Sequence, residues 1–167
     1  SGDTEDTSDP VDTAPPEVCR TEGDIEGPYY TAGAPERTDL ADGVEGTPLE
    51  VRGTIVQTDC TTPRAHAVFD VWHADDAGVY DNEGMRLRGK VVCDADGRFV
   101  FTTVLPGRYD VRPVRHIHFK IWDRLDGAEL ITSQIYFSGD PEYRPESHTG
   151  PVVDVGEDNV VDVILAV

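Results

Sequence analysis

Residues 94–109, DADGRFVFTTVLPGRY, contain the pattern that decides the fold. Asp94–Gly97 is rich in the residues that favour tight turns. Residues 98–104 then combine aromatic, valine and threonine side chains, a composition typical of a β-strand. Leu105–Gly107 forms a second turn, and a further strand is expected to begin near Tyr109. A turn, a strand and a tight Pro-Gly turn occur in many β-sandwich modules, so this stretch predicts a fold and not a function.

The same pattern of short strands and polar turns continues in both directions along the chain. Strands are predicted at residues 49–57, 65–73, 87–93, 98–104, 115–122, 130–137 and 159–167. Turns rich in Asp, Gly and Pro separate them, and the one short helix that we expect lies near Thr38–Gly43. The sequence therefore predicts an all-β protein, an antiparallel β-sandwich with long loops that carry an active site.

Length and charge limit the classes of protein to consider. The 167 residues fit one domain, which we place at residues 18–167, behind an acidic, disordered tail or tether at 1–17. The formal net charge of −19 disfavours binding to nucleic acid or to anionic membranes. No apolar run is long enough to span a bilayer.

The three cysteines bear on the cellular compartment. Cys19 and Cys60 each lie in polar, loop-like sequence and could form a disulfide, whereas Cys93 follows two valines and is expected to be a buried free thiol. The alternative is three free thiols in a cytosolic protein. We expect an exported protein that is secreted, periplasmic or tethered to the cell surface. The opening residues lack the features of a signal peptide, and an export signal or a lipid anchor upstream of Ser1 would explain the acidic tail.

Two histidines in the stretch RHIHFKI suggest a metal site. Side chains alternate between the two faces of a strand, so His116 and His118 lie side by side on one face, while Ile117 and Phe119 point to the other. Two neighbouring imidazoles can bind one ion. The simpler alternative is that both belong to the polar outer face of a half-exposed strand.

Two tyrosines could complete such a site. Tyr80 follows a strand end and a glycine-containing turn, and Tyr109 follows the Pro106–Gly107 turn. A single tyrosine in such a loop more often packs at a rim than binds metal. Together with the two histidines they form a coherent set, because phenolate is a hard anionic donor and two phenolates favour iron(III) over iron(II).

At this point the chain resembles the intradiol ring-cleavage dioxygenases, a family that includes the catechol and protocatechuate dioxygenases. The matching stretches are IEGPYY (25–30), AVFDVWHAD (67–75) with Gly78 and Tyr80, LRG (87–89), DG (96–97) with FTT (101–103), PGRY (106–109), HIHF (116–119) and TSQIYF (132–137). They occur in the family's order over most of the predicted domain. The resemblance is greatest to the short secreted members, which lack an N-terminal helical dimerisation region; whether the chain is a monomer or a homodimer stays open.

The resemblance implies roles for individual residues. Tyr80 matches the tyrosinate that stays on Fe(3+), Tyr109 the one that leaves when substrate binds, and His116 and His118 the imidazole ligands. Gln134 matches a glutamine that helps to position the substrate. The ring pocket is expected to be lined by Ile25, Pro28 and Tyr29.

One position departs from the family pattern. The family usually has an arginine three residues before the first histidine ligand, where it stabilises charge on the bound ring; this chain has Pro113 there. Arg112 and Arg115 flank the proline, and a local bulge could bring either to the site. Arg115 would otherwise point away from the face that carries His116, so Arg112 is preferred.

The implied activity is intradiol cleavage of a catechol-type aromatic diol by O2 to a muconate-type diacid, with neutral catechols favoured by the acidic surface. One alternative is an iron(II) oxygenase in which His73, Asp75 and a later histidine form a two-histidine, one-carboxylate site. A second is a non-catalytic β-sandwich of the transthyretin-like type. We interpret His73 and Asp75 as polar caps of a strand end, and His66 and His148 as surface residues.

Overall fold

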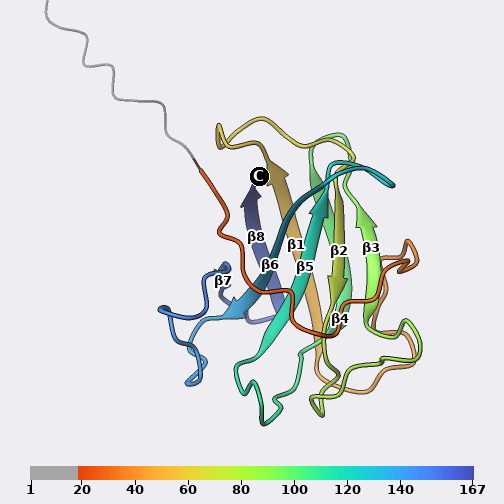
Figure 1. The fold of residues 1–167 in the computed structure, drawn as a ribbon, viewed down its shortest axis with the longest axis vertical. Helices are drawn as coiled ribbons and strands as arrows, with labels where there is room; N and C mark the ends of the chain where they lie inside the picture. Colours follow the sequence, from red (N-terminus) through yellow and green to blue (C-terminus); the bar gives the residue numbers. More distant parts are fainter. Residues whose placement is uncertain (1–18) are drawn as a thin grey trace, which may run out of the picture.

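The computed structural model describes residues 19–167 and shows two β-sheets packed face to face (Figure 1). The predicted tail at residues 1–17 lies outside the described residues, so this part of the domain prediction stays untested. Within the described part, no helix is long and apolar enough to cross a membrane.

Eight strands build the two sheets. They are β1 (Pro48–Val56), β2 (Val68–Trp72), β3 (Arg88–Val92), β4 (Arg98–Val104), β5 (His116–Trp122), β6 (Glu129–Phe137), β7 (Val152–Val153) and β8 (Val160–Ala166). One sheet has the order β4-β1-β8 and the other β3-β2-β5-β6-β7. The predicted all-β sandwich is confirmed. Only β7 was not predicted, because a strand of two residues is too short to show alternation.

The sequence predicted an antiparallel sandwich, and in the structure two of the strand pairs are parallel. Strand β8 runs parallel to β1, and β7 runs parallel to β6. Alternation along one strand shows which side chains are buried, but it does not show the direction of the partner strand. The short helix expected near Thr38–Gly43 is also absent from the described structure. Thr38 and Leu40 instead bond to the backbone of Thr102 on β4, as an extended segment does.

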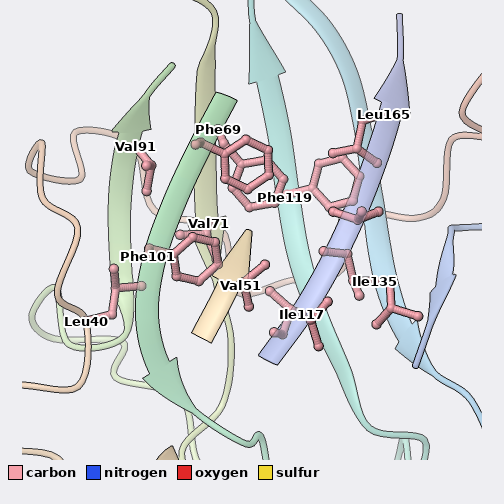
Figure 2. Close-up of a cluster of buried hydrophobic side chains, with 14 of the residues drawn as sticks. Leu40, Val51, Phe69, Val71, Val91, Phe101, Ile117, Phe119, Ile135 and Leu165 are labelled. Carbon is pink, nitrogen blue, oxygen red and sulfur yellow. The ribbon is translucent and has the colours of Figure 1, made fainter. Parts of the chain in front are cut away.

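The hydrophobic core fills the space between the two sheets (Figure 2). Phe69 of β2 stacks on Phe99 and Phe119, at ring distances of 4.4 and 4.9 Å, and so joins both sheets. Because β5 places Ile117 and Phe119 in this core, it must turn His116 and His118 to the opposite face. The paired histidines therefore lie on the outer face of the five-stranded sheet.

A segment that we call the arm, residues 19–37, crosses this outer face (Figure 1). Its backbone bonds to β6 at one end, where Asp24 N donates to Thr132 O, and to β3 at the other, where Lys90 N donates to Pro35 O. Between these points, Lys120 of β5 forms an ion pair with Glu26 of the arm. The arm covers polar side chains that would otherwise face solvent, so the site is built between the sheet and the arm.

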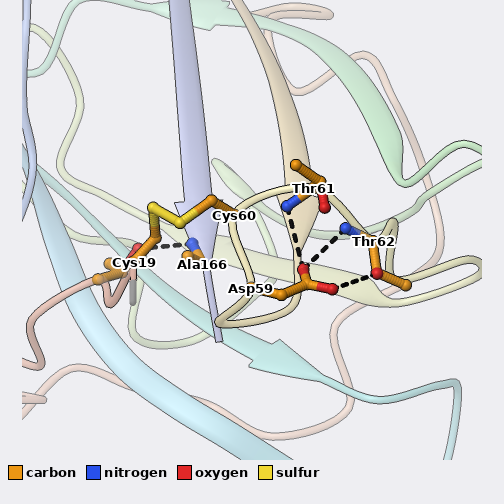
Figure 3. The surroundings of a disulfide bond; sticks show 7 residues. Cys19, Asp59, Cys60, Thr61, Thr62 and Ala166 are labelled. Carbon is orange, nitrogen blue, oxygen red and sulfur yellow. Dashed lines mark hydrogen bonds between the residues drawn. A yellow bond between two sulfur atoms is a disulfide. The ribbon is translucent and has the colours of Figure 1, made fainter. Parts of the chain in front are cut away.

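A disulfide fixes the start of the arm. Cys19 is bonded to Cys60 in the loop between β1 and β2 (Figure 3). In that loop the carboxylate of Asp59 accepts hydrogen bonds from the backbone NH groups of Thr61 and Thr62. Cys93 is a buried free thiol, as predicted, and burial raises its pKa to about 12.

Candidate metal centre

The two predicted tyrosines and the two predicted histidines lie together on the outer face of the five-stranded sheet. The Tyr80 hydroxyl lies 3.2 Å from Nε2 of His116, and the Tyr109 hydroxyl lies 3.4 Å from the same nitrogen. The rings of His116 and His118 are 4.7 Å apart. The structure thus brings all four side chains to a common point, and their role as metal ligands stays a prediction.

The histidines are oriented by their neighbours. Nδ1 of His116 lies 2.7 Å from the carbonyl oxygen of Val114. Since a carbonyl only accepts, Nδ1 must hold the proton, which leaves the lone pair of Nε2 facing the two phenols. His118 stacks on Trp72 at 4.9 Å with nearly parallel rings, and its Nδ1 is buried without a hydrogen-bond partner in the described structure. A buried ring nitrogen without a partner in the described structure is unusual.

The two tyrosine loops contact each other through glycine backbone. A Cβ atom built on Gly78 would lie 2.2 Å from the carbonyl oxygen of Arg108, and one built on Gly107 would lie 2.3 Å from that of Asp76. Gly78 also has a positive φ of 82°. Only glycine allows this approach. The contact therefore sets the spacing between the loops that end in Tyr80 and Tyr109.

We expect Gly78→Ala to lower both stability and iron content. The left-handed backbone alone costs an alanine about 1 kcal/mol, and the clash with Arg108 must in addition push the two loops apart. Gly33 is a matched control, because its φ is 85° but nothing lies within 4 Å of an added Cβ. Thermal melts and iron per chain should separate the two variants. Equal behaviour of Gly33→Ala and Gly78→Ala would contradict a role for the loop contact.

Arg88 joins the arm to the Tyr80 loop, and the sequence analysis gave it no role. Its buried guanidinium donates to the carbonyl oxygen of Tyr29 at 2.6 Å and to that of Asp81 at 3.0 Å. Tyr29 in turn stacks on Tyr80, with ring centroids 4.4 Å apart. In the sequence, Arg88 stands out only as part of the motif LRG (87–89), and that motif does not indicate these partners.

Of the residues predicted to line the pocket, Tyr29 contacts the candidate centre directly, since its ring stacks on that of Tyr80, and the role of the others stays a prediction. Gln134 lies opposite His118 in the β5–β6 register, and its Nε2 donates to the carbonyl oxygen of Ile25 at 2.8 Å. The Ile25 side chain is 62% exposed, so it lies at the rim. Pro28 and Tyr29 border a surface hollow of about 330 Å³. A second cavity, of about 250 Å³, is lined by Tyr29, Gly78, Val79, Tyr80, Asn82 and Tyr109.

The structure separates the two candidate arginines. The Arg112 guanidinium donates to the Tyr136 hydroxyl at 2.8 Å, and its positive charge acts on both tyrosines and both histidines of the centre. Arg115 instead donates to the carbonyl oxygen of Pro106 at 2.6 Å. Arg112 is therefore brought to the centre and Arg115 is not.

Burial keeps all four side chains of the centre uncharged when no cation is present. It raises the pKa of Tyr80 and of Tyr109, although the charge of Arg112 opposes the effect. It lowers the pKa of His116 to about 4 and that of His118 well below the ordinary value. Two neutral imidazoles and two phenols that need a nearby cation to ionise are a suitable donor set for a trivalent, hard metal ion. These residues fit iron(III).

The alternative iron(II) site finds no support in the structure. Nδ1 of His73 lies 2.7 Å from Ala74 O and Nε2 lies 2.6 Å from the Thr103 hydroxyl, so both ring nitrogens have partners. Asp75 accepts hydrogen bonds from two backbone NH groups of its own turn. Among residues 19–167, no three His, Cys, Asp or Glu side chains are placed to hold a metal ion. His66 is exposed as predicted, but His148 is half-buried.

The buried, neutral His73 should make stability depend on pH. Burial lowers its pKa to about 4 from an ordinary value of 6.5. A lowered pKa favours the neutral form in the fold. The contribution of neutral His73 to the free energy of unfolding is therefore complete above pH 6.5 and is lost as pH falls toward 4. The full loss is about 3 kcal/mol. Urea unfolding between pH 7 and 4 should show a smaller pH slope for His73→Gln than for the exposed control His66→Asn.

Comparison with known proteins places this arrangement in a class. The family model described as Dioxygenase matches residues 25–115, more than half of the chain. The chlorocatechol 1,2-dioxygenase of Pseudomonas putida is 36% identical, over 69% of this chain and 53% of that enzyme. The catechol 1,2-dioxygenase of Acinetobacter baylyi is 29% identical, over 98% of this chain and 60% of that enzyme. A solved dioxygenase domain, from a dioxygenase carbohydrate-binding protein fusion of Streptomyces sp. SirexAA-E, has a TM-score of 0.76 at 30% identity, covering 89% of this chain and 98% of that one.

The fold and the matched sequence thus define a dioxygenase-type β-sandwich. The chain belongs to the intradiol ring-cleavage dioxygenase family. It spans about half the length of several of the curated relatives that it matches.

Proposed function

We propose that this protein is a mononuclear iron(III) enzyme that opens catechol-type rings by intradiol cleavage with O2. The observation that carries the proposal is the convergence of the Tyr80 and Tyr109 hydroxyls on Nε2 of His116, beside His118. These four residues would hold the metal. Bound iron(III) supplies Lewis acidity, which lowers the pKa of the catechol hydroxyls and makes the ring reactive toward O2.

The chain's own residues supply positioning and proton transfer. Tyr109 is more exposed than Tyr80, and its phenolate, which would form when the metal is bound, is placed to take up a proton from a catechol hydroxyl as substrate binds. The guanidinium of Arg112 faces the same centre and stabilises negative charge that develops on the ring oxygens. The Gln134 amide helps to position the substrate, and the stacked rings of Tyr29 and Tyr80 form an apolar wall.

The substrate that we favour is a neutral, single-ring catechol. A cavity of about 250 Å³ beside the tyrosines suits one aromatic ring with small substituents. The net charge of −19 disfavours the approach of anionic catechols. Relatives are named for catechol, chlorocatechol and hydroxyquinol, which provide the first compounds to test.

An oxygen electrode tests the reaction directly. Iron-loaded protein should consume O2 with at least one of catechol, chlorocatechol and hydroxyquinol, and the product should have the ultraviolet absorbance of a muconate-type diacid. A yellow extradiol product would contradict intradiol cleavage. Purified protein without stoichiometric iron, and without O2 uptake after iron loading, would support the non-catalytic sandwich instead.

We also infer that the protein works outside the reducing cytoplasm, as secreted, periplasmic or surface-tethered. The disulfide between Cys19 and Cys60 supports this inference, because such bonds persist mainly in oxidising compartments. Alkylation of the denatured protein from its native source should modify Cys93 and leave Cys19 and Cys60 unmodified. Modification of all three would argue for the cytosol.

A further inference from the structure

The hydroxyl of Tyr136 links Arg112 to a carboxylate on the arm. It accepts a hydrogen bond from Nη2 of Arg112 at 2.8 Å and donates one to Oδ2 of Asp24, also at 2.8 Å. A weaker contact of 3.2 Å joins the same hydroxyl to Oε1 of Gln134. Tyr136 lies on β6 directly opposite His116, so this network is adjacent to the candidate metal centre.

The carboxylate of Asp24 is held by backbone from two separate segments. Its Oδ2 accepts from Thr149 N at 2.9 Å and from Gly150 N at 3.2 Å, while Oδ1 accepts from Ile25 N at 2.7 Å. With the bond from Tyr136, Oδ2 accepts three hydrogen bonds and Oδ1 accepts one. Asp24 cannot turn without breaking several bonds, so it fixes where the Tyr136 proton points.

This fixed proton gives the Tyr136 oxygen a defined role. Because its hydrogen is directed at Asp24, a lone pair is left to face Arg112. Arg112 lies on a tight turn that begins at Tyr109, and the neighbouring Val111 side chain is 95% exposed. Within residues 19–167, the guanidinium forms no hydrogen bond other than that to Tyr136. A neutral phenol holds the guanidinium in place and leaves its positive charge uncompensated. A direct ion pair with a carboxylate would cancel that charge.

We propose that Tyr136, itself fixed by Asp24, is a positioning residue that aims the Arg112 guanidinium at the substrate ring. The proposal rests on the proposed function, in which Arg112 stabilises charge on that ring. It also explains how an arginine four residues before His116, instead of three, can serve the site. Although Arg112 lies one residue further from His116 than the family's arginine does, its hydrogen bond to Tyr136 on β6 holds its guanidinium near the site.

A double-mutant cycle tests the coupling in iron-loaded protein. We expect Tyr136→Phe to lower kcat about tenfold with little change in KM, and Arg112→Ala to lower it about a hundredfold. Adding Tyr136→Phe to Arg112→Ala should have no further effect, and guanidinium ion should rescue Arg112→Ala better than the double variant. Tyr143→Phe is the matched control. Its ring packs 5.6 Å from that of Tyr136, and within the described residues its hydroxyl bonds only to the carbonyl of His148.

Crystal structures give a readout that does not need activity. The Arg112 guanidinium should stay bonded to Tyr136 in the wild type and lose its fixed position in Tyr136→Phe and in Asp24→Asn. A fixed Arg112 in Tyr136→Phe, or additive kinetic effects of the two substitutions, would overturn the proposal. If no catechol is cleaved by the wild type, the proposed function fails, and the crystal structures still decide whether Tyr136 positions Arg112.

Discussion

Tyr80→Phe should weaken the red-brown absorption band expected of the iron-loaded protein and remove most of its ring-cleaving activity. Tyr80 is buried, faces Nε2 of His116 and is supported by the stacked ring of Tyr29. Removing its oxygen takes away one of two anionic donors, while the ring still fills the same space. We expect iron affinity and kcat each to fall about a hundredfold. Visible absorption, iron content and O2 uptake measure the three effects.

Two further phenylalanine variants sharpen that experiment. Tyr109→Phe should also weaken the visible band, because the two tyrosinates contribute to it together. Tyr30→Phe should leave the band unchanged, because the Tyr30 hydroxyl bonds to Asp70 on the same sheet face and not to the candidate ligands. A Tyr80→Phe protein with an unaltered band would refute the assignment of Tyr80 as a ligand.

Local sequence patterns predicted the fold and the histidine pair. The two-residue period of a strand is enough to place Ile117 and Phe119 in the core and His116 and His118 on the other face. The strand boundaries were correct to within three residues, since turns rich in Asp, Gly and Pro mark them clearly. Strand boundaries and the two faces of a strand depend on residues that are close together in the sequence, so one sequence is enough to predict them.

Contacts between distant segments were not predictable in the same way. Strand alternation gave only a preference for Arg112 over Arg115. The contacts that separate them are with Tyr136 and Pro106, which lie on other segments. The role of Arg88 depends on the carbonyl oxygens of two loops that it joins. A backbone carbonyl can accept a hydrogen bond whatever the residue type. The sequence therefore does not indicate these contacts, and the structure was needed to find them.

Removing the disulfide should cause the largest loss of stability. The bond joins Cys19 to Cys60 across a separation of 41 residues. In the chain-entropy account, opening a loop of that size lowers the free energy of unfolding by about 4 kcal/mol. Urea unfolding of Cys19→Ser/Cys60→Ser at neutral pH measures the change. Cys93→Ser is the control that alters a buried thiol and leaves the cross-link intact.

The effect on activity should be much smaller than the effect on stability, because the arm has other attachments. Asp24 bonds to Tyr136, Lys120 pairs with Glu26, and Arg88 holds the carbonyl of Tyr29, all beyond the disulfide. Below its unfolding transition, the double serine variant should therefore retain its iron and most of its kcat. A variant that stays folded but loses iron would show instead that the cross-link itself holds the arm over the site.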